Sequence, residues 1–413
     1  MKIAFLASFR ETSVGGESRV AVELAETLAE HGHDVVYICP GDITGFIPQP
    51  DGLNRFTLAS IGDGEVVASN VSGKHLRQLY QFLDEFKPDV IHTHTYLLIG
   101  AVVQKWALRH NVPFLYTAHE LPTKLGEFSQ GYPLVKWAKR TFVFMAVVRA
   151  FYRHCSVVVA LNQSAVNDLR ELGYTGKLVH IDNGRDLKRL NACPLPSRDA
   201  PIRRLIFTGH IIPRKNQEYL VEMMRYLPTH YHLKLVGYIG HRGYHEELCQ
   251  KVADYGLKNV EFTGRIEPRV IPDMLADTHV FVSASVLEVQ SLAVIEALAA
   301  GKPVVGLANQ TVSEFVDDSC GATLPQTATP QAFAEAVMRV ADAPDYEMLC
   351  QNARQKVKKH DWETVIHETI TAYQTCLAEK GQTPPKRSVV IRIYARMTSF
   401  IFGVVFWVGD RAK

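Results

Sequence analysis

The sequence predicts an α/β protein made of two domains, each with helices on both faces of a parallel sheet, which is the doubly wound arrangement. The chain has 413 residues, and at roughly 150 residues per domain this length gives two or three domains. In both halves, short apolar runs alternate with segments of helical periodicity, as in repeated βαβ units. A stretch at 186–201 contains three prolines and no apolar periodicity, so we read it as a linker. We therefore place an N-terminal domain at 1–190 and a C-terminal domain at 202–361.

The first domain opens with one complete βαβ unit. Residues 2–7 are a short apolar run, 17–31 carry an apolar stripe at helical spacing, and 34–39 form the next strand. The same alternation continues with helices at 74–86, 98–110 and 163–172 and strands at 89–92, 113–117 and 156–161. These strands are nearly continuous apolar runs, which is typical of strands buried in a parallel sheet.

The second domain repeats this alternation after the linker. Its predicted strands are 204–208, 232–236, 260–263, 280–283 and 303–306, and its predicted helices are 216–227, about 290–300, and 330–342. A last helix, 362–378, closes the series. We expect a central cleft between the carboxyl ends of the two sheets, because ligands bind at that location in doubly wound folds.

The composition is that of an ordinary globular protein, with 47% hydrophobic residues, and excludes a mainly disordered chain. Lys and Arg total 45 against 43 Asp and Glu, so the formal net charge of +2 gives no reason to expect a nucleic-acid partner. Seven cysteines without a Cys-x-x-Cys pair indicate free thiols in a reducing cytoplasm. The N-terminal sequence lacks the pattern of a signal peptide, so we expect a cytoplasmic protein.

Two segments, 132–155 and 386–413, are basic and rich in aromatic residues. Within the second, 398–408 is strongly apolar but has only about eleven residues, fewer than the roughly 20 that span a bilayer. We interpret 386–413 as an amphipathic tail on an anionic membrane surface, with a helix packed on another subunit as the alternative. For 132–155 the alternative is an ordinary core helix with a basic flank. The candidate membrane contacts are Trp137, Lys139, Arg140, Arg392, Arg396, Phe400, Phe402, Phe406 and Trp407.

Gly15 and Gly16 lie between the first strand and its helix. Backbone N–H groups at such a helix N-terminus suit a phosphate, although a plain tight turn is the alternative. The third glycine of the dinucleotide-binding fingerprint is absent, which disfavours an NAD-dependent oxidoreductase.

Histidines follow two neighbouring strands of the first domain. His119, beside Glu120, could orient a substrate hydroxyl or handle a proton, and a hydrogen-bonded surface histidine is the alternative. His92 and His94 alternate along the preceding strand and could face opposite sides of the sheet. No spacing among these histidines is typical of a metal site, so we expect none.

The loop 209–216 connects the first strand of the second domain to its helix. It opens with Gly209 and His210, and it places Arg214 and Lys215 at the start of the helix. Basic residues at a helix N-terminus are unfavourable unless an anion lies there, so we interpret the pair as phosphate ligands.

Glu288 and Glu296 are separated by seven residues. Glu288 falls in the turn after the strand at 280–283, and Glu296 lies two turns into an apolar helix. A carboxylate in such surroundings needs a partner, which ribose hydroxyls would supply. A glutamate on the solvated face of an amphipathic helix is the alternative.

In order and spacing, these motifs resemble those of retaining glycosyltransferases of family 4, which have the GT-B fold of two Rossmann-like domains facing a central cleft. The resemblance covers residues 1–378 and also includes Ile181–Asp186, Asp361–Trp362, and Ala297, Gly301 and Pro303. It implies that Gly15 and Gly16 approach the phosphate or the acceptor, and that the helix 362–378 packs back on the first domain.

The resemblance also implies roles for single residues. His119 lines the reaction centre near the transferred sugar, Lys215 grips the diphosphate, Glu288 contacts the donor sugar and Glu296 holds the ribose. The remaining candidates for nucleotide-sugar binding are Gly209, His210, Arg214, Val289, Gln290, Ser291 and Leu292. Two departures stand out: His210 replaces the usual arginine, and Val289, Gln290 and Ser291 replace the usual glycines.

We therefore expect a retaining glycosyltransferase that moves a sugar from a UDP-sugar or GDP-sugar to a hydroxyl of a lipid or glycolipid at the cytoplasmic face of a membrane. No Asp-x-Asp motif lies near a suitable strand end, so we expect no metal and no other cofactor. No nucleophile for a double displacement is evident, which favours front-side attack by the acceptor. Two alternatives stay open, namely the same chemistry on a soluble or polysaccharide acceptor, and a non-catalytic nucleotide-sugar binder.

Overall fold

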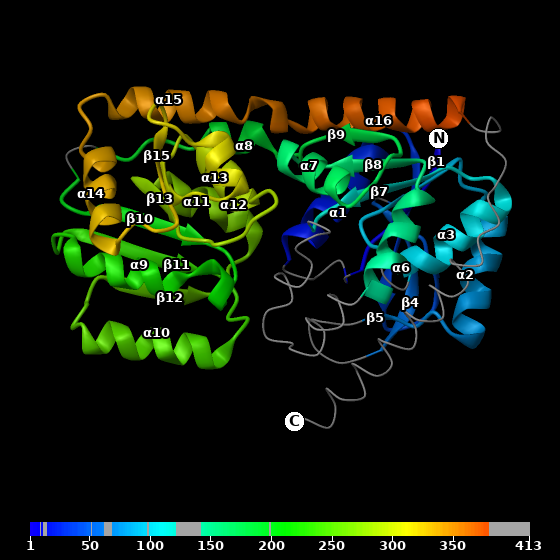
Figure 1. The fold of residues 1–413 in the computed structure, drawn as a ribbon, viewed down its shortest axis with the longest axis horizontal. Coiled ribbons are helices and arrows are strands. Elements are labelled where there is room, and N and C mark those ends of the chain that lie inside the picture. The colour runs from blue at the N-terminus through cyan, green and yellow to red at the C-terminus, as the bar shows by residue number, and fades with distance from the viewer. Residues whose placement is uncertain are drawn as a thin grey trace. The chain divides into compact units, whose positions relative to one another are not determined.

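The computed structural model describes residues 1–8, 10, 15–50, 52–61, 68–96, 99–120, 142–197 and 200–379 of the chain. The chain divides into two compact units (Figure 1). Unit 1 contains Met1–Asn183 together with the described residues from Glu363 onward, and unit 2 contains Gly184–Trp362. Each unit is an α/β body with a mainly parallel sheet, as the sequence predicts.

Unit 1 is built on a sheet whose order is β3-β4-β2-β1-β6-β7-β8-β9, with β5 paired to β4. Its strands are β1 (Lys2–Leu6), β2 (Asp34–Gly41), β3 (Gly45–Ile47), β4 (Asn54–Ile61), β5 (Ala68–Ser69), β6 (Val90–Thr93), β7 (Phe114–Ala118), β8 (Val157–Ala160) and β9 (Leu178–His180). All pairs are parallel except β3·β4 and β4·β5. The central strand β1 aligns Ala4 with Val36 of β2 and with Ile91 of β6. Four of its five residues are buried, as expected for a strand covered on both faces.

The described helices of unit 1 are α1 (Gly16–Glu30), α2 (Gly73–Phe86), α3 (Ile99–His110), α6 (Phe142–Arg153), α7 (Gln163–Glu171) and, from Glu363 onward, α16 (Trp362–Ala378). Helix α16 contributes to the core of unit 1 through Tyr373, which is fully buried. Its hydroxyl lies 2.7 Å from Nδ1 of His92 at the end of β6.

Helix α6 corrects one interpretation of the segment 132–155. Phe151 and Tyr152 are 0% and 2% exposed, and their rings pack edge-on against Tyr116 of β7. Phe151 and Tyr152 therefore belong to the core rather than to a membrane contact, because their side chains cover the sheet. Trp137, Lys139 and Arg140 lie outside the described residues, as do the candidate membrane contacts of the tail. No helix in the described part of the chain combines the length and the apolarity that crossing a membrane requires.

Unit 2 (green to orange in Figure 1) has a six-stranded parallel sheet in the order β12-β11-β10-β13-β14-β15. Its strands are β10 (Arg203–Thr208), β11 (Tyr231–Val236), β12 (Val260–Gly264), β13 (Val280–Ser283), β14 (Val304–Leu307) and β15 (Gly321–Leu324). Its α-helices are α8 (Leu187–Asn191), α9 (Gln217–Met223), α10 (Arg242–Asp254), α11 (Ile271–Ala276), α12 (Leu292–Ala299), α13 (Gln310–Phe315), α14 (Pro330–Ala341) and α15 (Tyr346–Lys356). Short 3₁₀ helices span Pro213–Lys215, Met224–Tyr226, Pro268–Val270 and Lys358–His360.

Two apolar clusters cover the two faces of this sheet. One packs α9, α10 and α14 against residues such as Leu205 and Phe207 of β10. The other packs α8, α11, α12, α13 and α15 against residues such as Ile206 of the same strand. Because alternate residues of β10 point to opposite faces, the sheet is the middle of three layers.

The predicted linker is partly helical and belongs to unit 2. Asp186 caps α8 by accepting a hydrogen bond from the backbone N–H of Arg189 (3.1 Å). Leu187 and Leu190 of this single turn are buried in the core cluster that contains α12. Unit 2 therefore begins at Gly184 rather than at 202. Helix α8 shows no apolar period in the sequence, because its five residues supply only two buried side chains.

Candidate functional site

In unit 2, the loop after β10 carries the two basic residues that the sequence analysis selected. Pro213, Arg214 and Lys215 form a 3₁₀ turn, and Asn216 then takes a left-handed conformation (φ 54°) before α9 begins at Gln217. Lys215 therefore precedes α9 instead of forming its first turn. The backbone N–H of Val286 donates to the carbonyl of Arg214 (3.1 Å), which ties this loop to the loop after β13.

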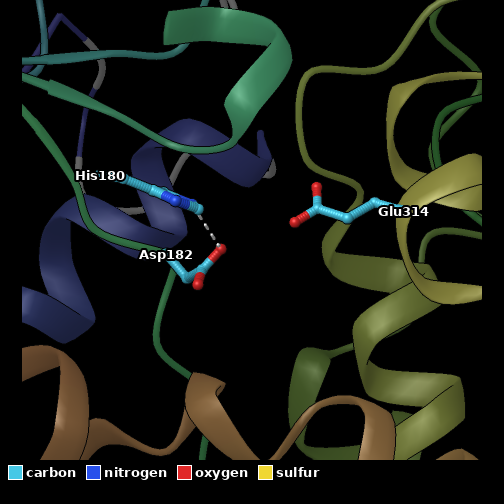
Figure 2. A group of neighbouring side chains, drawn as sticks. All are labelled: His180, Asp182 and Glu314. Atoms are coloured by element: carbon cyan, nitrogen blue, oxygen red, sulfur yellow. Dashed lines mark hydrogen bonds and ion pairs between the residues drawn. The ribbon is translucent and has the colours of Figure 1, made fainter.

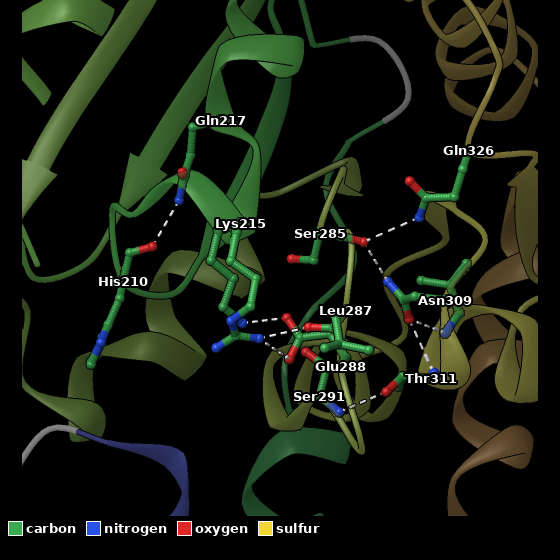
Figure 3. A network of polar contacts seen from close by, with 12 residues as sticks. His210, Lys215, Gln217, Ser285, Leu287, Glu288, Ser291, Asn309, Thr311 and Gln326 are labelled. Atoms are coloured by element: carbon green, nitrogen blue, oxygen red, sulfur yellow. Dashed lines mark hydrogen bonds and ion pairs between the residues drawn. The ribbon is translucent and has the colours of Figure 1, made fainter. Parts of the chain in front are cut away.

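Arg214 and Lys215 converge on one carboxylate, that of Glu288. Figure 3 shows Lys215 directed at Glu288. The Lys215 ammonium donates to Oε1 of Glu288. The Arg214 guanidinium donates to the carbonyl of Leu287 (2.6 Å) and lies 3.8 Å from Oε2 of Glu288. The side chains of Arg214 and Lys215 are only 19% and 15% exposed. The sequence analysis expected these two bases to need an anion. Within the protein, the Glu288 carboxylate is that anion.

The electrostatics of Glu288 follow from this arrangement. Burial alone would raise the pKa of the Glu288 carboxyl, but the charges of Lys215 and Arg214 outweigh burial and hold that pKa below its ordinary value. Two cations therefore face one carboxylate in a largely buried site. The three side chains carry a net positive charge, which favours the approach of an anion.

The residues between Glu288 and helix α12 are buried and partly engaged. Val289, Gln290 and Ser291 are 5%, 8% and 8% exposed, and Leu292, which begins α12, is half-buried. The backbone N–H of Ser291 donates to Oγ1 of Thr311 (2.8 Å; Figure 3). The amide of Ser291 is therefore already bonded within the protein, which removes it from the candidate donors to a phosphate or a sugar.

The side-chain amide of Asn309, which follows β14, holds the 285–291 loop. Its side-chain oxygen caps α13 by accepting from the backbone N–H groups of Thr311 and Val312, both at 3.0 Å. Its Nδ2 donates to the carbonyl of Ser285 (2.9 Å), and Gln326 donates to that carbonyl as well (3.5 Å; Figure 3). Neighbouring strand ends thus hold the 285–291 loop in place.

Glu296 is buried, and its cationic partner lies within the protein. It is 5% exposed on α12, and its Oε1 is 3.3 Å from Nε of Arg185, which is 1% exposed. The sequence analysis expected ribose hydroxyls to be the partner that burial of this carboxylate requires. It gave Arg185 no role, because the contact joins residues that are far apart in the sequence and no local pattern marks it.

Two glycines bring the loops after β10 and β11 into close contact. Gly209 has a φ of 150° and Gly237 a φ of 152°, backbone conformations that other residues rarely adopt. A Cβ on Gly237 would lie 1.9 Å from the carbonyl oxygen of Gly209. His210 follows on the first loop, and its ring packs edge-on against Tyr238 at 5.8 Å. The carbonyl of His210 accepts from the Gln217 amide (2.8 Å; Figure 3).

In unit 1, the histidines at the ends of β6 and β7 form a connected group. His119 and His94 are hydrogen-bonded through Nε2 and Nδ1 (2.8 Å). The ring of His94 lies 4.9 Å from that of His92, so the two rings are on the same side, contrary to the alternation considered above. The reason is that β6 ends at Thr93, and the strand alternation does not continue to His94. His92 is held between Tyr373 and Thr117, each 2.7 Å from one of its ring nitrogens.

Burial keeps these imidazoles neutral at neutral pH. Desolvation, with a smaller contribution from His119, lowers the pKa of His92 to about 3 and that of His94 well below its ordinary value. Desolvation also lowers the pKa of His119. At neutral pH, His119 therefore offers a substrate one N–H donor or one lone pair, but no positive charge.

The other predicted residues of unit 1 lie at the ends of α1 and β7, and a further polar contact lies at the end of β9. Gly15 caps α1 and Gly16 is its exposed first residue, with Glu17 in the first turn. Glu120, next to His119, accepts a hydrogen bond from the Tyr96 hydroxyl (2.9 Å). At the end of β9, Nε2 of His180 lies 3.3 Å from Oδ1 of the buried Asp182 (Figure 2).

Comparison with protein families identifies both halves of the chain. Residues 14–189 match the model described as Glycosyltransferase Family 4, and residues 199–359 match the model described as Glycosyl transferases group 1. A relative over most of the length is a UDP-Gal:alpha-D-GlcNAc-diphosphoundecaprenol alpha-1,3-galactosyltransferase of Escherichia coli. It is 23% identical over 371 residues, covering 83% of this chain and 89% of the relative.

Solved structures share the fold. A sucrose-phosphate synthase from Thermosynechococcus elongatus superposes with a TM-score of 0.75 at 22% identity, covering 92% of this chain and 99% of that chain. HepE of Anabaena, solved in complex with UDP and glucose, superposes with a TM-score of 0.71 at 18% identity, covering 91% and 100%. The fold is therefore GT-B, with two Rossmann-like units, as the resemblance implied.

Proposed function

Because the chain belongs to glycosyltransferase family 4 and is a glycosyltransferase, we propose that it transfers a sugar, with retention of configuration, from a nucleoside-diphosphate sugar to a hydroxyl of a membrane lipid or glycolipid. The observation that carries the proposal is the convergence of Lys215 and Arg214 on Glu288 in unit 2. Two partly buried cations against one carboxylate leave a positive charge that a diphosphate would neutralise.

In this reaction the glycosidic bond from the anomeric carbon to the acceptor oxygen forms as the bond from that carbon to the phosphate oxygen breaks. The departing diphosphate takes the bonding electrons, and Lys215 and Arg214 stabilise the charge that develops on it. In front-side attack, the proton of the acceptor hydroxyl passes to the departing phosphate oxygen. The chain's own cations supply the positive charge in this scheme, so we propose that no metal is needed.

The choice of a lipid acceptor has two supports. The segment 386–413 combines aromatic and basic residues in the manner of an interfacial anchor. The Escherichia coli relative is named for transfer to a diphosphoundecaprenol-linked sugar. A soluble acceptor is the second candidate, favoured by the structural similarity to a protein titled sucrose-phosphate synthase.

The role of Lys215 is tested by Lys215→Ala in the full chain, assayed for release of UDP or GDP from nucleotide sugars with and without acceptor. We expect turnover to fall roughly 100- to 1,000-fold, because one fixed charge at the departing group is lost. The matched control is Lys234→Ala, which removes a more exposed lysine of the same unit, paired with Glu261 at 3.6 Å, and should leave turnover unchanged. Turnover of Lys215→Ala within about twofold of wild type would exclude the assigned role.

The acceptor is tested by comparing a polyprenyl-diphosphate-linked sugar in anionic vesicles with soluble sugars and sugar phosphates. Deletion of 386–413 should abolish sedimentation with the vesicles and reduce transfer to the lipid, while release of nucleotide from the donor alone persists. Preference for a soluble acceptor, with no effect of the deletion, would favour the second candidate. Activity that survives EDTA is expected, and its loss with restoration by Mg²⁺ would refute metal independence.

A further inference from the structure

Arg185 occupies a fixed position at the start of unit 2. Its backbone N–H donates to the carbonyl of His360 (2.7 Å), and it forms an isolated parallel bridge with Asp361. The preceding Gly184 leaves room for the indole of Trp362, since a Cβ there would lie 2.1 Å from a ring carbon. The backbone of Arg185 is therefore held by the segment that ends unit 2.

The side chain of Arg185 is directed into the core beside α12. Only 1% of it is exposed, and its Nη1 donates to the carbonyl of Gly184 (2.8 Å). Its Nε lies 3.3 Å from Oε1 of Glu296, whose side chain is 7% exposed. A buried carboxylate next to a planar, permanently charged guanidinium is restricted to few orientations, because leaving the contact would strand both charges.

We propose that Arg185 is a positioning residue for nucleotide recognition, which fixes the Glu296 carboxylate in the orientation that accepts the ribose hydroxyls of the donor. This rests on the proposed function, in which Glu296 holds the ribose. Arg185 supplies the charge that burial of the carboxylate requires, with its Nε 3.3 Å from Oε1. The ribose then needs to provide only hydrogen bonds. Because the Glu296 side chain is already oriented before the nucleotide binds, binding costs little side-chain entropy.

The prediction concerns selectivity between ribose and deoxyribose. A vicinal diol donates two hydrogen bonds to a correctly oriented carboxylate, whereas a 2′-deoxynucleotide donates one. With Arg185 in place, loss of one hydrogen bond to a charged acceptor should weaken binding at least tenfold. Without Arg185, the orientation of Glu296 is lost, and this difference should shrink to within about threefold.

The experiment measures binding of UDP, GDP and their 2′-deoxy counterparts to the full chain by calorimetry, for wild type, Arg185→Met and Arg185→Lys. In Arg185→Met we expect the affinity for the ribonucleotide to fall toward the affinity for the deoxynucleotide. The affinity for the deoxynucleotide should change little. Arg185→Lys keeps the positive charge but lacks the planar guanidinium, so its selectivity for the ribonucleotide should be intermediate. Steady-state assays should show a raised KM for the donor with little change in kcat, unlike the effect of Lys215→Ala.

The control is Arg204→Met, which removes an arginine of unit 2 that is 40% exposed and 3.1 Å from Asp277. It should retain wild-type selectivity. Wild-type selectivity in a folded Arg185→Met variant overturns the proposal, and so does failure of both Arg185 variants to fold, which would show a structural role only. Equal affinity of the wild type for UDP and 2′-deoxy-UDP overturns the proposal together with the role of Glu296. If the wild type binds neither UDP nor GDP, the proposed function itself fails.

Discussion

Acid should destabilise unit 1, because His92 and His94 are buried there in the neutral form. The pKa of His92 is about 3 in the folded chain, against 6.5 for an ordinary histidine. Below pH 6.5 the unfolded chain binds a proton that the folded chain does not, so stability is present above pH 6.5 and is lost as the pH falls from 6.5 toward 3. Acidification from pH 7 to pH 5 should cost about 2 kcal/mol through His92 alone, at 1.36 kcal/mol for each pH unit in the window. The lowered pKa of His94 adds to the loss in the same direction.

The assay is urea denaturation of the full chain at pH 7, 6 and 5, followed by tryptophan fluorescence. The transition of unit 1 is the one whose signal is reduced in Trp106→Phe, since Trp106 is buried in unit 1. His92→Gln removes one buried titrating group and should flatten the pH dependence by about 1 kcal/mol per unit, even though the variant is less stable at pH 7. His232→Gln replaces an exposed histidine and serves as the control. An unchanged pH slope in His92→Gln would refute the reasoning.

Two further substitutions test contacts that shape the two units. Gly237→Ala should destabilise unit 2 by several kcal/mol, of the order of other strained backbone and steric conflicts, because φ is 152° and the added Cβ would meet a carbonyl oxygen at 1.9 Å. Gly243→Ala, inside α10, should instead stabilise it by up to about 1 kcal/mol, and a similar effect of both in thermal unfolding would contradict the argument. Tyr373→Phe should destabilise unit 1 by about 1–3 kcal/mol, because it leaves a ring nitrogen of His92 without its partner. Tyr226→Phe, at an exposed position, is the control, and equal unfolding midpoints for the two tyrosine variants would show that the hydroxyl contributes nothing.

Many of the strands could be predicted because they are nearly continuous apolar runs. The strand at 280–283 has the same bounds in the sequence analysis and in the structure, and all four of its residues are buried. The sequence analysis also predicted neither the longer β4, α10 and α15 nor several short elements. The short ones have too few residues to show a pattern. The antiparallel additions β3 and β5 have three and two residues, too few to establish a period, and α8 is a single turn.

Long-range partners could not be predicted from local patterns. The apolar surroundings of Glu296 indicated that it needs a partner, but the partner proved to be Arg185, which the fold brings from the start of unit 2. In the same way, nothing near His92 in the sequence indicates Tyr373 of the last helix. Local sequence context shows that a buried polar group needs a hydrogen-bonding or charged partner. Only the tertiary fold decides which residue is that partner.

The affinity of the proposed donor site depends on contacts that Lys215 and Arg214 already make within the protein. Lys215 is bonded to Glu288 in the protein alone, so a diphosphate that binds Lys215 competes with an existing ion pair. The free energy gained is the difference between two buried charge contacts, and it is much smaller than the energy of either contact taken singly. Arg214 lies farther from the carboxylate, at 3.8 Å, and is directed by its bond to the carbonyl of Leu287. It can therefore contribute to anion binding without first breaking a close ion pair, whereas Lys215 exchanges one anion for another. The Glu288 carboxylate makes the burial of both cations tolerable within the protein, and in the proposed donor site it is the group with which a phosphate would compete.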